Sequence, residues 1–229
     1  MKKLFLGLAV SLGSLALAQE KAETRSKSSI SFGVKGGMNV SSLTDGSNNA
    51  YWSNYERKAK IGFNAGVFAN IPISGQFSVQ PEILYNGLGS KIESTINFDI
   101  PEARMDIKEN LSLSYLSVPL MLQYNLLPEL YVEAGPEFGF LLGGKAKSEF
   151  TQTSNIDGAS STQSHTGKIV MDLFNKFNFG IGIGAGYYFT QNLAVTARYT
   201  AGITDIYKYN TGDAVRNNAL QVGLAYKFK

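Results

Sequence analysis

The sequence contains no cysteine, one histidine and one tryptophan in 229 residues. Without cysteine the chain cannot form disulfides, thiolate metal sites, thiol nucleophiles or lipid-modified cysteines. A single histidine adds little metal-binding capacity, so we expect neither a metal site nor a cofactor. Charged residues make up only 17% of the chain, and the formal net charge is +3. That balance gives no reason to expect nucleic acid as a partner.

Long apolar runs are also missing after the N-terminal segment. A short basic start (residues 1–3) precedes an apolar run (residues 4–17), and residues 16–18 have the A-x-A pattern of a cleavage site. These features predict a signal peptide over residues 1–18, cleaved after Ala18, rather than a short transmembrane helix. We expect the polar residues 19–29 to be a flexible lead-in. No later run approaches the roughly 20 apolar residues of a spanning helix, so membrane insertion would require strands.

Alternation of apolar and polar residues is the dominant pattern from residue 30 onward, and it predicts strands. Eight segments carry this pattern: residues 30–40, 61–71, 77–85, 116–124, 130–140, 177–189, 193–203 and 220–228. Their lengths suit tilted strands that cross a bilayer, which need about 9–11 residues. Short connections alternate with long ones, and the long ones are residues 41–60, 86–115, 141–176 and 204–219. For residues 30–229 we therefore predict an all-β fold, an eight-stranded antiparallel up-and-down transmembrane β-barrel.

The two faces of these strands distinguish a membrane barrel from a soluble ligand-binding barrel. A soluble barrel points its apolar face inward and usually carries many charges on its outer face. Here the polar face consists chiefly of Gly, Ser, Asn, Gln and Thr, which suit a confined lumen better than a solvated surface. Aromatic residues also gather near both ends of the apolar faces, as expected at the two membrane interfaces. The pattern favours a bacterial outer-membrane protein over a soluble periplasmic barrel.

Six charged residues fall on the predicted lumen face of the strands: Lys35, Glu82, Glu133, Glu137, Arg198 and Lys227. An eight-stranded barrel has an interior just filled by side chains, so we expect these charges to pair in a packed network. A gated polar pathway is the functional alternative. The segment N-F-G-I-G-I-G-A-G-Y-Y-F adds a lumen-facing glycine column at Gly180, Gly182, Gly184 and Gly186. Three prolines inside predicted strands (Pro81, Pro119 and Pro136) should cause bulges or missing ladder bonds there.

The long connections contain candidate contact residues. Trp52 and Tyr55 lie beside Arg57 and Lys58. Exposed aromatic and cationic residues of this kind could bind a partner, or they could anchor the barrel at lipid headgroups. His165 lies in a Ser/Thr-rich segment, where Ser164 or Asp157 could join it in a catalytic triad. One histidine among many serines is expected in any polar loop, so we assign no catalytic residues.

Four motifs resemble the PorT-like outer-membrane β-barrel family, and the resemblance covers nearly all of residues 30–229. They are V-Q-P-E-I-L-Y-N at 79–86, Y-L-S-V-P-L-M-L-Q-Y at 115–124, E-A-G-P-E-F-G-F-L-L at 133–142 and F-G-I-G-I-G-A-G-Y-Y-F at 179–189. The resemblance implies an eight-stranded outer-membrane barrel. It does not fix a function, because one fold supports many functions.

The sequence therefore predicts an integral outer-membrane barrel that is not an enzyme and has a structural, partner-binding or transport- or secretion-accessory role. A narrow porin-like channel for small polar solutes is the first alternative. A hydrolase or acyltransferase built from the loops is the second. We expect outer-membrane lipids, and envelope or secretion-system proteins, as partners of a monomer.

Overall fold

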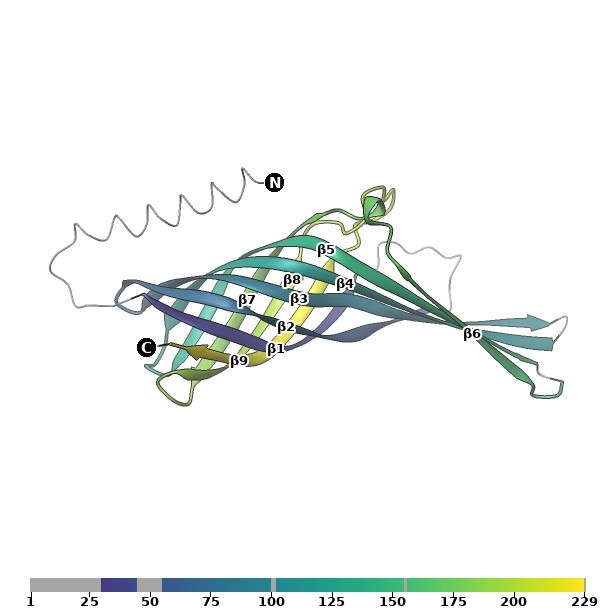
Figure 1. Cartoon of the computed structure of the whole chain (residues 1–229), viewed down its shortest axis with the longest axis horizontal. Coiled ribbons are helices and arrows are strands. Elements are labelled where there is room, and N and C mark those ends of the chain that lie inside the picture. Colours follow the sequence, from purple (N-terminus) through teal and green to yellow (C-terminus); the bar gives the residue numbers. More distant parts are fainter. Residues whose placement is uncertain (1–29, 45–54, 100–101, 155, 229) are drawn as a thin grey trace.

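The computed structural model describes residues 30–44, 55–99, 102–154 and 156–228. The predicted signal peptide, the lead-in and Trp52 lie outside these residues. The described chain is almost entirely β-structure, with one short 3-10 helix (Figure 1). No helix among the described residues is long and apolar enough to cross a membrane. The elements are β1 Ser31–Leu43, β2 Tyr55–Ser74, β3 Phe77–Asp99, β4 Glu102–Asn125, β5 Leu130–Ser154, β6 Ser160–Lys168, η3 Met171–Leu173, β7 Phe177–Tyr188, β8 Leu193–Gly202 and β9 Asn217–Lys227.

Eight of the nine strands form a closed ring. Antiparallel neighbours follow one another from β1 to β5 and from β7 to β9, and β5 pairs with β7. Pairing of β1 with β9 closes the ring, with Val34 opposite Tyr226 and Met38 opposite Val222. Closure leaves no unpaired edge inside a membrane, where unsatisfied backbone groups are very costly. The predicted eight-stranded antiparallel transmembrane barrel is confirmed.

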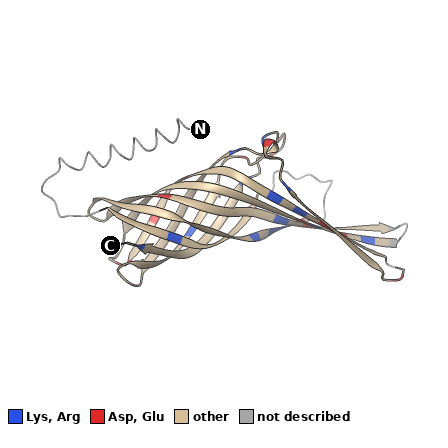
Figure 2. Ribbon diagram, viewed as in Figure 1, with Lys and Arg blue, Asp and Glu red and all other residues tan. Residues whose placement is uncertain are grey.

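The barrel is apolar outside and polar inside. Alternate residues of β7 show this, since Ile181 and Ile183 are exposed while Gly180 and Gly182 are buried. In β1, Met38 is 64% exposed and its neighbour Asn39 is completely buried. Charged residues are sparse along the barrel strands (Figure 2). Water would not favour such an exterior, and a bilayer does, so the soluble-barrel alternative is rejected.

The prediction of long loops at residues 86–115 and 141–176 is wrong, because most of these residues belong to strands. Strands β3, β4 and β5 continue for 23, 24 and 25 residues, and β6 adds a hairpin to β5. We call the part beyond the barrel the projecting sheet: residues 55–59, 91–99, 102–110, 147–154 and 160–168. It extends well past the barrel mouth, opposite the end where the chain finishes (Figure 1). Alternation did not predict these extensions because they carry polar and charged residues on the face where barrel strands carry lipid-facing apolar ones.

The three strand prolines interrupt pairing without shifting its register. Between β3 and β4, pairing stops after Pro81–Leu120 and resumes at Leu84–Ser117. Between β4 and β5 it stops after Pro119–Glu137 and resumes at Leu122–Ala134, which leaves Pro136 unpaired on that side. The predicted local loss of ladder bonds is confirmed, because proline has no N–H to donate.

Candidate functional site

An ion-pair cluster occupies the middle of the lumen. Arg198 extends from β8 across the barrel to Glu82 of β3, and its two terminal nitrogens donate to the Glu82 carboxylate over 2.8 and 2.7 Å. Its Nε donates to Glu133 Oε1 of β5 over 2.7 Å. All three side chains are at most 1% exposed. Such a buried pair is stable only when its charges are balanced and its hydrogen bonds are satisfied.

Neutral amides and one lysine complete the cluster. Gln80 donates to Glu82 Oε1 over 2.8 Å, and Gln123 donates to Glu133 Oε2 over 2.9 Å. Lys35 Nζ lies 3.5 Å from Glu82 Oε1. Of the six lumen charges singled out in the sequence, the structure brings four together: Lys35, Glu82, Glu133 and Arg198.

The other two charges contact neutral groups outside this cluster. Glu137 accepts hydrogen bonds from Thr200 over 3.0 Å and from Asn86 over 3.3 Å, and both donors are neutral. Lys227 lies at the short-turn end, where its Nζ is 4.6 Å from the centre of the Tyr188 ring. It lines a polar cavity of about 490 Å³ at the mouth on that side.

The glycine column of β7 faces the lumen beside the cluster. Gly184 is opposite Arg198 in the β7–β8 ladder. A Cβ at Gly184 would come within 2.6 Å of the Ala197 carbonyl oxygen and 3.1 Å of Glu133 Oε1, and a Cβ at Gly182 would lie 3.4 Å from Arg198 Cδ. The column therefore leaves the space that the buried guanidinium group and its carboxylates fill.

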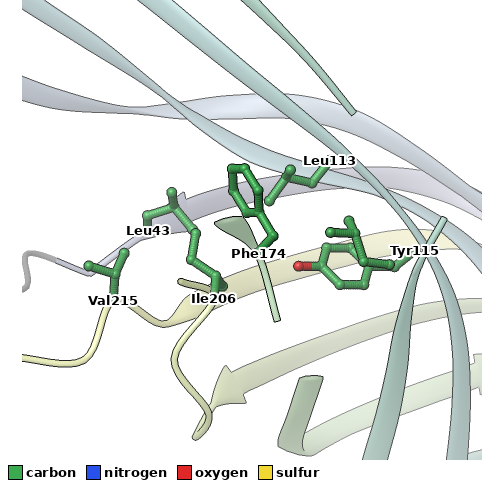
Figure 3. Packing of buried hydrophobic residues seen from close by; sticks show 7 residues of the cluster. Leu43, Leu113, Tyr115, Phe174, Ile206 and Val215 are labelled. Carbon is green, nitrogen blue, oxygen red and sulfur yellow. The ribbon is translucent and has the colours of Figure 1, made fainter. Parts of the chain in front are cut away.

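An apolar cluster that was not predicted from the sequence fills the other end of the lumen. We call it the outer plug (Figure 3): Leu43, Leu113, Tyr115, Leu141, Phe174, Ile206 and Val215. It unites strand residues with two connections, 169–176 and 203–216. These correspond to parts of the predicted long connections 141–176 and 204–219, apart from residue 203, which was predicted to end a strand. The only signal in the sequence was the apolar content of I-V-M-D-L-F at 169–174, which a solvated loop does not need.

Backbone hydrogen bonds fix the two plug connections to each other. Asn175 donates from its backbone to Ile206 O over 2.9 Å, and its side chain donates to the carbonyls of Asp205 and Tyr207 over 2.8 and 3.1 Å. Lys208 N donates to Leu173 O over 3.0 Å. The plug is therefore held by directional bonds as well as by apolar packing, and it closes the lumen on this side.

The projecting sheet reverses the polarity of the barrel below it. On the face that continues the lumen side, the cross-strand row Ser94–Ile107–Phe150–Gln163 is followed by the row Ile96–Met105–Gln152–Ser161. On the opposite face the row Glu93–Lys108–Glu149–Ser164 alternates in charge. We call these the inner and outer faces. Phe98 and Phe150 on the inner face are 43% and 40% exposed.

Two of the four loop residues singled out in the sequence have described side chains, and both belong to the edge of this sheet. Arg57 pairs with Ile92 in the β2–β3 ladder. Lys58 Nζ lies 2.6 Å from Glu93 Oε2 and 3.5 Å from Glu56 Oε2. The hydrogen bond with Lys58 holds the pKa of Glu93 below its usual value, and the same bond raises the pKa of Lys58. Tyr55 begins β2 opposite Ser94.

Comparison with known proteins gives a family and a set of similar folds. The model of the outer membrane protein beta-barrel domain matches residues 17–208. Similar solved structures include Ail of Yersinia pestis (16% identity, 86% of this chain and 98% of that one, TM-score 0.38) and Neisserial surface protein A (14%, 87% and 99%, 0.41). Outer membrane protein W of E. coli is also similar (14%, 89% and 100%, 0.40). No curated protein sequence matches the chain. The match over most of its length shows that the chain belongs to the outer membrane protein β-barrel domain family.

Proposed function

We propose that the chain is a non-conducting, non-enzymatic barrel of the bacterial outer membrane that presents its projecting sheet to a partner protein outside the cell. The observation that carries the proposal is the reversed polarity of the sheet. A sheet in water with no partner is expected to expose polar side chains on both faces. Here the inner face presents a set of partly exposed apolar residues: Ile92, Ile96, Phe98, Met105, Ile107 and Phe150.

Strand β6 supplies the second part of the binding surface. Within the described chain it pairs only with β5, so its other edge keeps free backbone donors and acceptors. Its nine residues, S-S-T-Q-S-H-T-G-K, contain no proline. An exposed edge of this length is a template for strand addition. The partner we propose is therefore an extended polypeptide segment whose alternate apolar side chains continue the inner face beyond Gln163.

The channel alternative is less well supported because two barriers lie in series along the lumen. The Arg198 cluster fills its middle and the outer plug fills one end. Purified protein in planar lipid bilayers should show no stable single-channel steps. Large, reproducible steps that change in Glu137→Ala would restore the channel interpretation.

The enzyme alternative is weakened by strand geometry. His165 and Ser164 are consecutive residues of β6, so their side chains point to opposite faces of the sheet. Asp157 lies in the turn before β6, where its carboxylate accepts from the Ala159 backbone over 3.0 Å. His165, Ser164 and Asp157 therefore do not face one another as the residues of a catalytic triad must.

A charge on the inner face of β6 tests the binding surface. Folded protein in nanodiscs is used to select from a displayed library of ten-residue peptides with alternating apolar and polar residues. Gln163→Lys should abolish enrichment of the selected peptides, because an inward-pointing charge on an edge strand blocks further pairing. Thr162→Lys places the same charge on the outer face of the same strand and should keep it. Equal enrichment with both variants, or none with the unaltered protein, would contradict the proposal.

We include in this proposal the PorT-like family, export by a signal peptide, contact with outer-membrane lipids and a monomeric state. The four motifs support a PorT-like member, and the basic and apolar start supports export with cleavage after Ala18. Lipids of the outer membrane would contact the apolar exterior, and a closed ring needs no second copy.

A further inference from the structure

A small chamber lies in the lumen between the outer plug and the Arg198 cluster. Its volume is about 20 Å³, enough for one water-sized occupant. The lining side chains that matter here come from five strands: Tyr115, Ser117, Glu137, Asn178, Thr200, Asn217 and Gln221. Oxygen-bearing groups therefore converge on a space of atomic size.

The polar atoms of this lining are unusually poor in partners. Tyr115 OH, Asn178 Nδ2, Gln221 Oε1 and both polar side-chain atoms of Asn217 have no hydrogen-bond partner within the described part of the chain. Tyr115, Asn217 and Gln221 are 1%, 5% and 3% exposed. Buried polar groups are nearly always bonded, so five such atoms around one chamber indicate an occupant that bonds to them.

The charge of the closed lumen identifies the sign of that occupant. Among the fully buried charges of the lumen, two cations (Lys35 and Arg198) face three carboxylates (Glu82, Glu133 and Glu137), so one negative charge is in excess. Lys227, the sixth lumen charge, is only half-buried and lines the cavity at the short-turn mouth. Arg198 is already bound by Glu82 and Glu133. Glu137 is 6% exposed, and both of its hydrogen-bond donors are neutral. A buried carboxylate requires a compensating charge or a proton.

We propose that the chamber binds one alkali metal cation, held by the Glu137 carboxylate with oxygens of Tyr115, Asn217 and Gln221. A single positive charge balances the fully buried charges of the lumen, whereas a divalent ion would leave them with a net positive charge. Among the described residues, Glu137 is the one carboxylate in the lining of this chamber. The amides of Asn178 and Asn217 can turn to present oxygen to the cation, since oxygen and nitrogen are interchangeable in shape.

The position of the chamber determines how the cation enters. The outer plug blocks one side, and the Arg198 cluster blocks the other. The cation is therefore captured as the barrel closes and exchanges slowly afterwards. Protein folded in the presence of the right cation should differ from protein to which the same salt is added after folding.

Refolding in different salts tests the site. The full chain is refolded into detergent micelles in chloride salts of lithium, sodium, potassium, rubidium or N-methyl-D-glucamine at equal ionic strength, and the thermal midpoint is measured. One alkali cation should raise the midpoint saturably. At 100 times its dissociation constant the folding equilibrium constant should rise about 100-fold. Identical midpoints in all five salts would overturn the proposal and would leave water beside a protonated Glu137 as the occupant.

Matched variants locate the effect. Glu137→Gln should remove the cation dependence, and Glu129→Gln, which alters an exposed carboxylate at the short-turn end, should keep it. A cation response in Glu137→Gln equal to that of the unaltered chain would overturn the site. If Glu137→Gln does not fold, Tyr115→Phe decides, because it removes one oxygen and keeps the ring in the plug. It should need several-fold more cation for half of the effect, and an unchanged requirement would count against the proposal.

Discussion

The barrel and the projecting sheet are built from the same strands, yet they place polar and apolar side chains on opposite faces. In the barrel, β3 points Glu82 and Asn86 inward and Ile83 and Tyr85 outward. Further along the same strand, Ile92 and Ile96 continue the inward side and Glu93 continues the outward side. The outward side of β3 meets lipid in the barrel and water in the projecting sheet. Its side chains are therefore apolar in the first region and polar in the second.

Register changes contribute to this reversal in two strands. A shift between Ser114 and Tyr115 in the β4–β5 ladder moves β5 by one residue. Below it Phe140 faces outward, and beyond it Phe150, another even-numbered residue, lies on the inner face. A shift in β2 between Ala59 and Asn64 acts in the same way. A one-residue shift exchanges the faces of a strand, so two bulges give part of the sequence a new orientation.

Removing one basic side chain from each region should give the largest difference in stability between the barrel and the projecting sheet. Arg198→Ala leaves Glu82 and Glu133 buried without their guanidinium partner, and breaking a buried pair in this way costs about 3–5 kcal/mol of folding free energy. Lys58→Ala removes the partner of Glu93 on the exposed edge and should leave stability almost unchanged. Urea unfolding in lipid vesicles measures both variants. Equal loss in the two would mean that the lumen charges are as well solvated as those of the sheet.

A lysine introduced on the outward side should give the second-largest difference between the barrel and the projecting sheet. Ile183→Lys puts a charge among lipid chains near mid-strand, where lysine costs about 2–4 kcal/mol. Thr162→Lys puts the same side chain on the outer face of the projecting sheet, where water surrounds it. Folded yield in vesicles should fall for the first variant and stay the same for the second. Normal insertion of Ile183→Lys would contradict the assignment of that face to lipid.

The ring of strands could be predicted from the sequence because one physical rule governs all eight. Lipid outside and a confined polar lumen inside impose strict alternation, and segments such as residues 177–189 show it directly. The lumen position of Arg198 followed from the same rule. Its partners did not, because Glu82 is 116 residues away and their contact depends on which strands face each other across the barrel.

The regions beyond the membrane could not be predicted in this way. In the projecting sheet both faces are partly wet, so the alternation between Lys91 and Asp99 loses the contrast that marks a spanning strand. The outer plug draws single residues from segments far apart, such as Leu43 and Val215. The neutral hydrogen-bond donors of Glu137 were hidden for a similar reason, since the carboxylates that bond to Arg198 are those of Glu82 and Glu133.

Replacing a glycine by alanine in each region should give a smaller difference in the free energy of unfolding. Gly184→Ala would press a Cβ against the Ala197 carbonyl oxygen at 2.6 Å, and overpacking of this kind costs about 1–3 kcal/mol. Gly143→Ala, at the β4–β5 register shift between the barrel and the projecting sheet, meets no atom within 4 Å and should be neutral. The free energy of unfolding in vesicles distinguishes them. A neutral Gly184→Ala would show that the glycine column is not needed to seat the Arg198 cluster.

Acidification should give the smallest effect, confined to the projecting sheet. The hydrogen bond from Lys58 lowers the pKa of Glu93, so the order contributed by this pair is present above the unfolded value of about 4.3 and is lost as the pH falls through the lower folded value. The raised pKa of Lys58 means that the pair is also lost at strongly alkaline pH, above the ordinary value of 10.5. Amide chemical shifts of residues 91–95, followed by NMR from pH 7 to pH 3, should move in a single step below pH 4.3 while those of β8 stay constant. In Lys58→Ala the step should move up toward the ordinary glutamate value, because the donor that lowers the pKa is gone. An unchanged midpoint in that variant would mean that Lys91 and Lys108, the other cations near Glu93, control its titration, and that the edge of the sheet does not depend on Lys58.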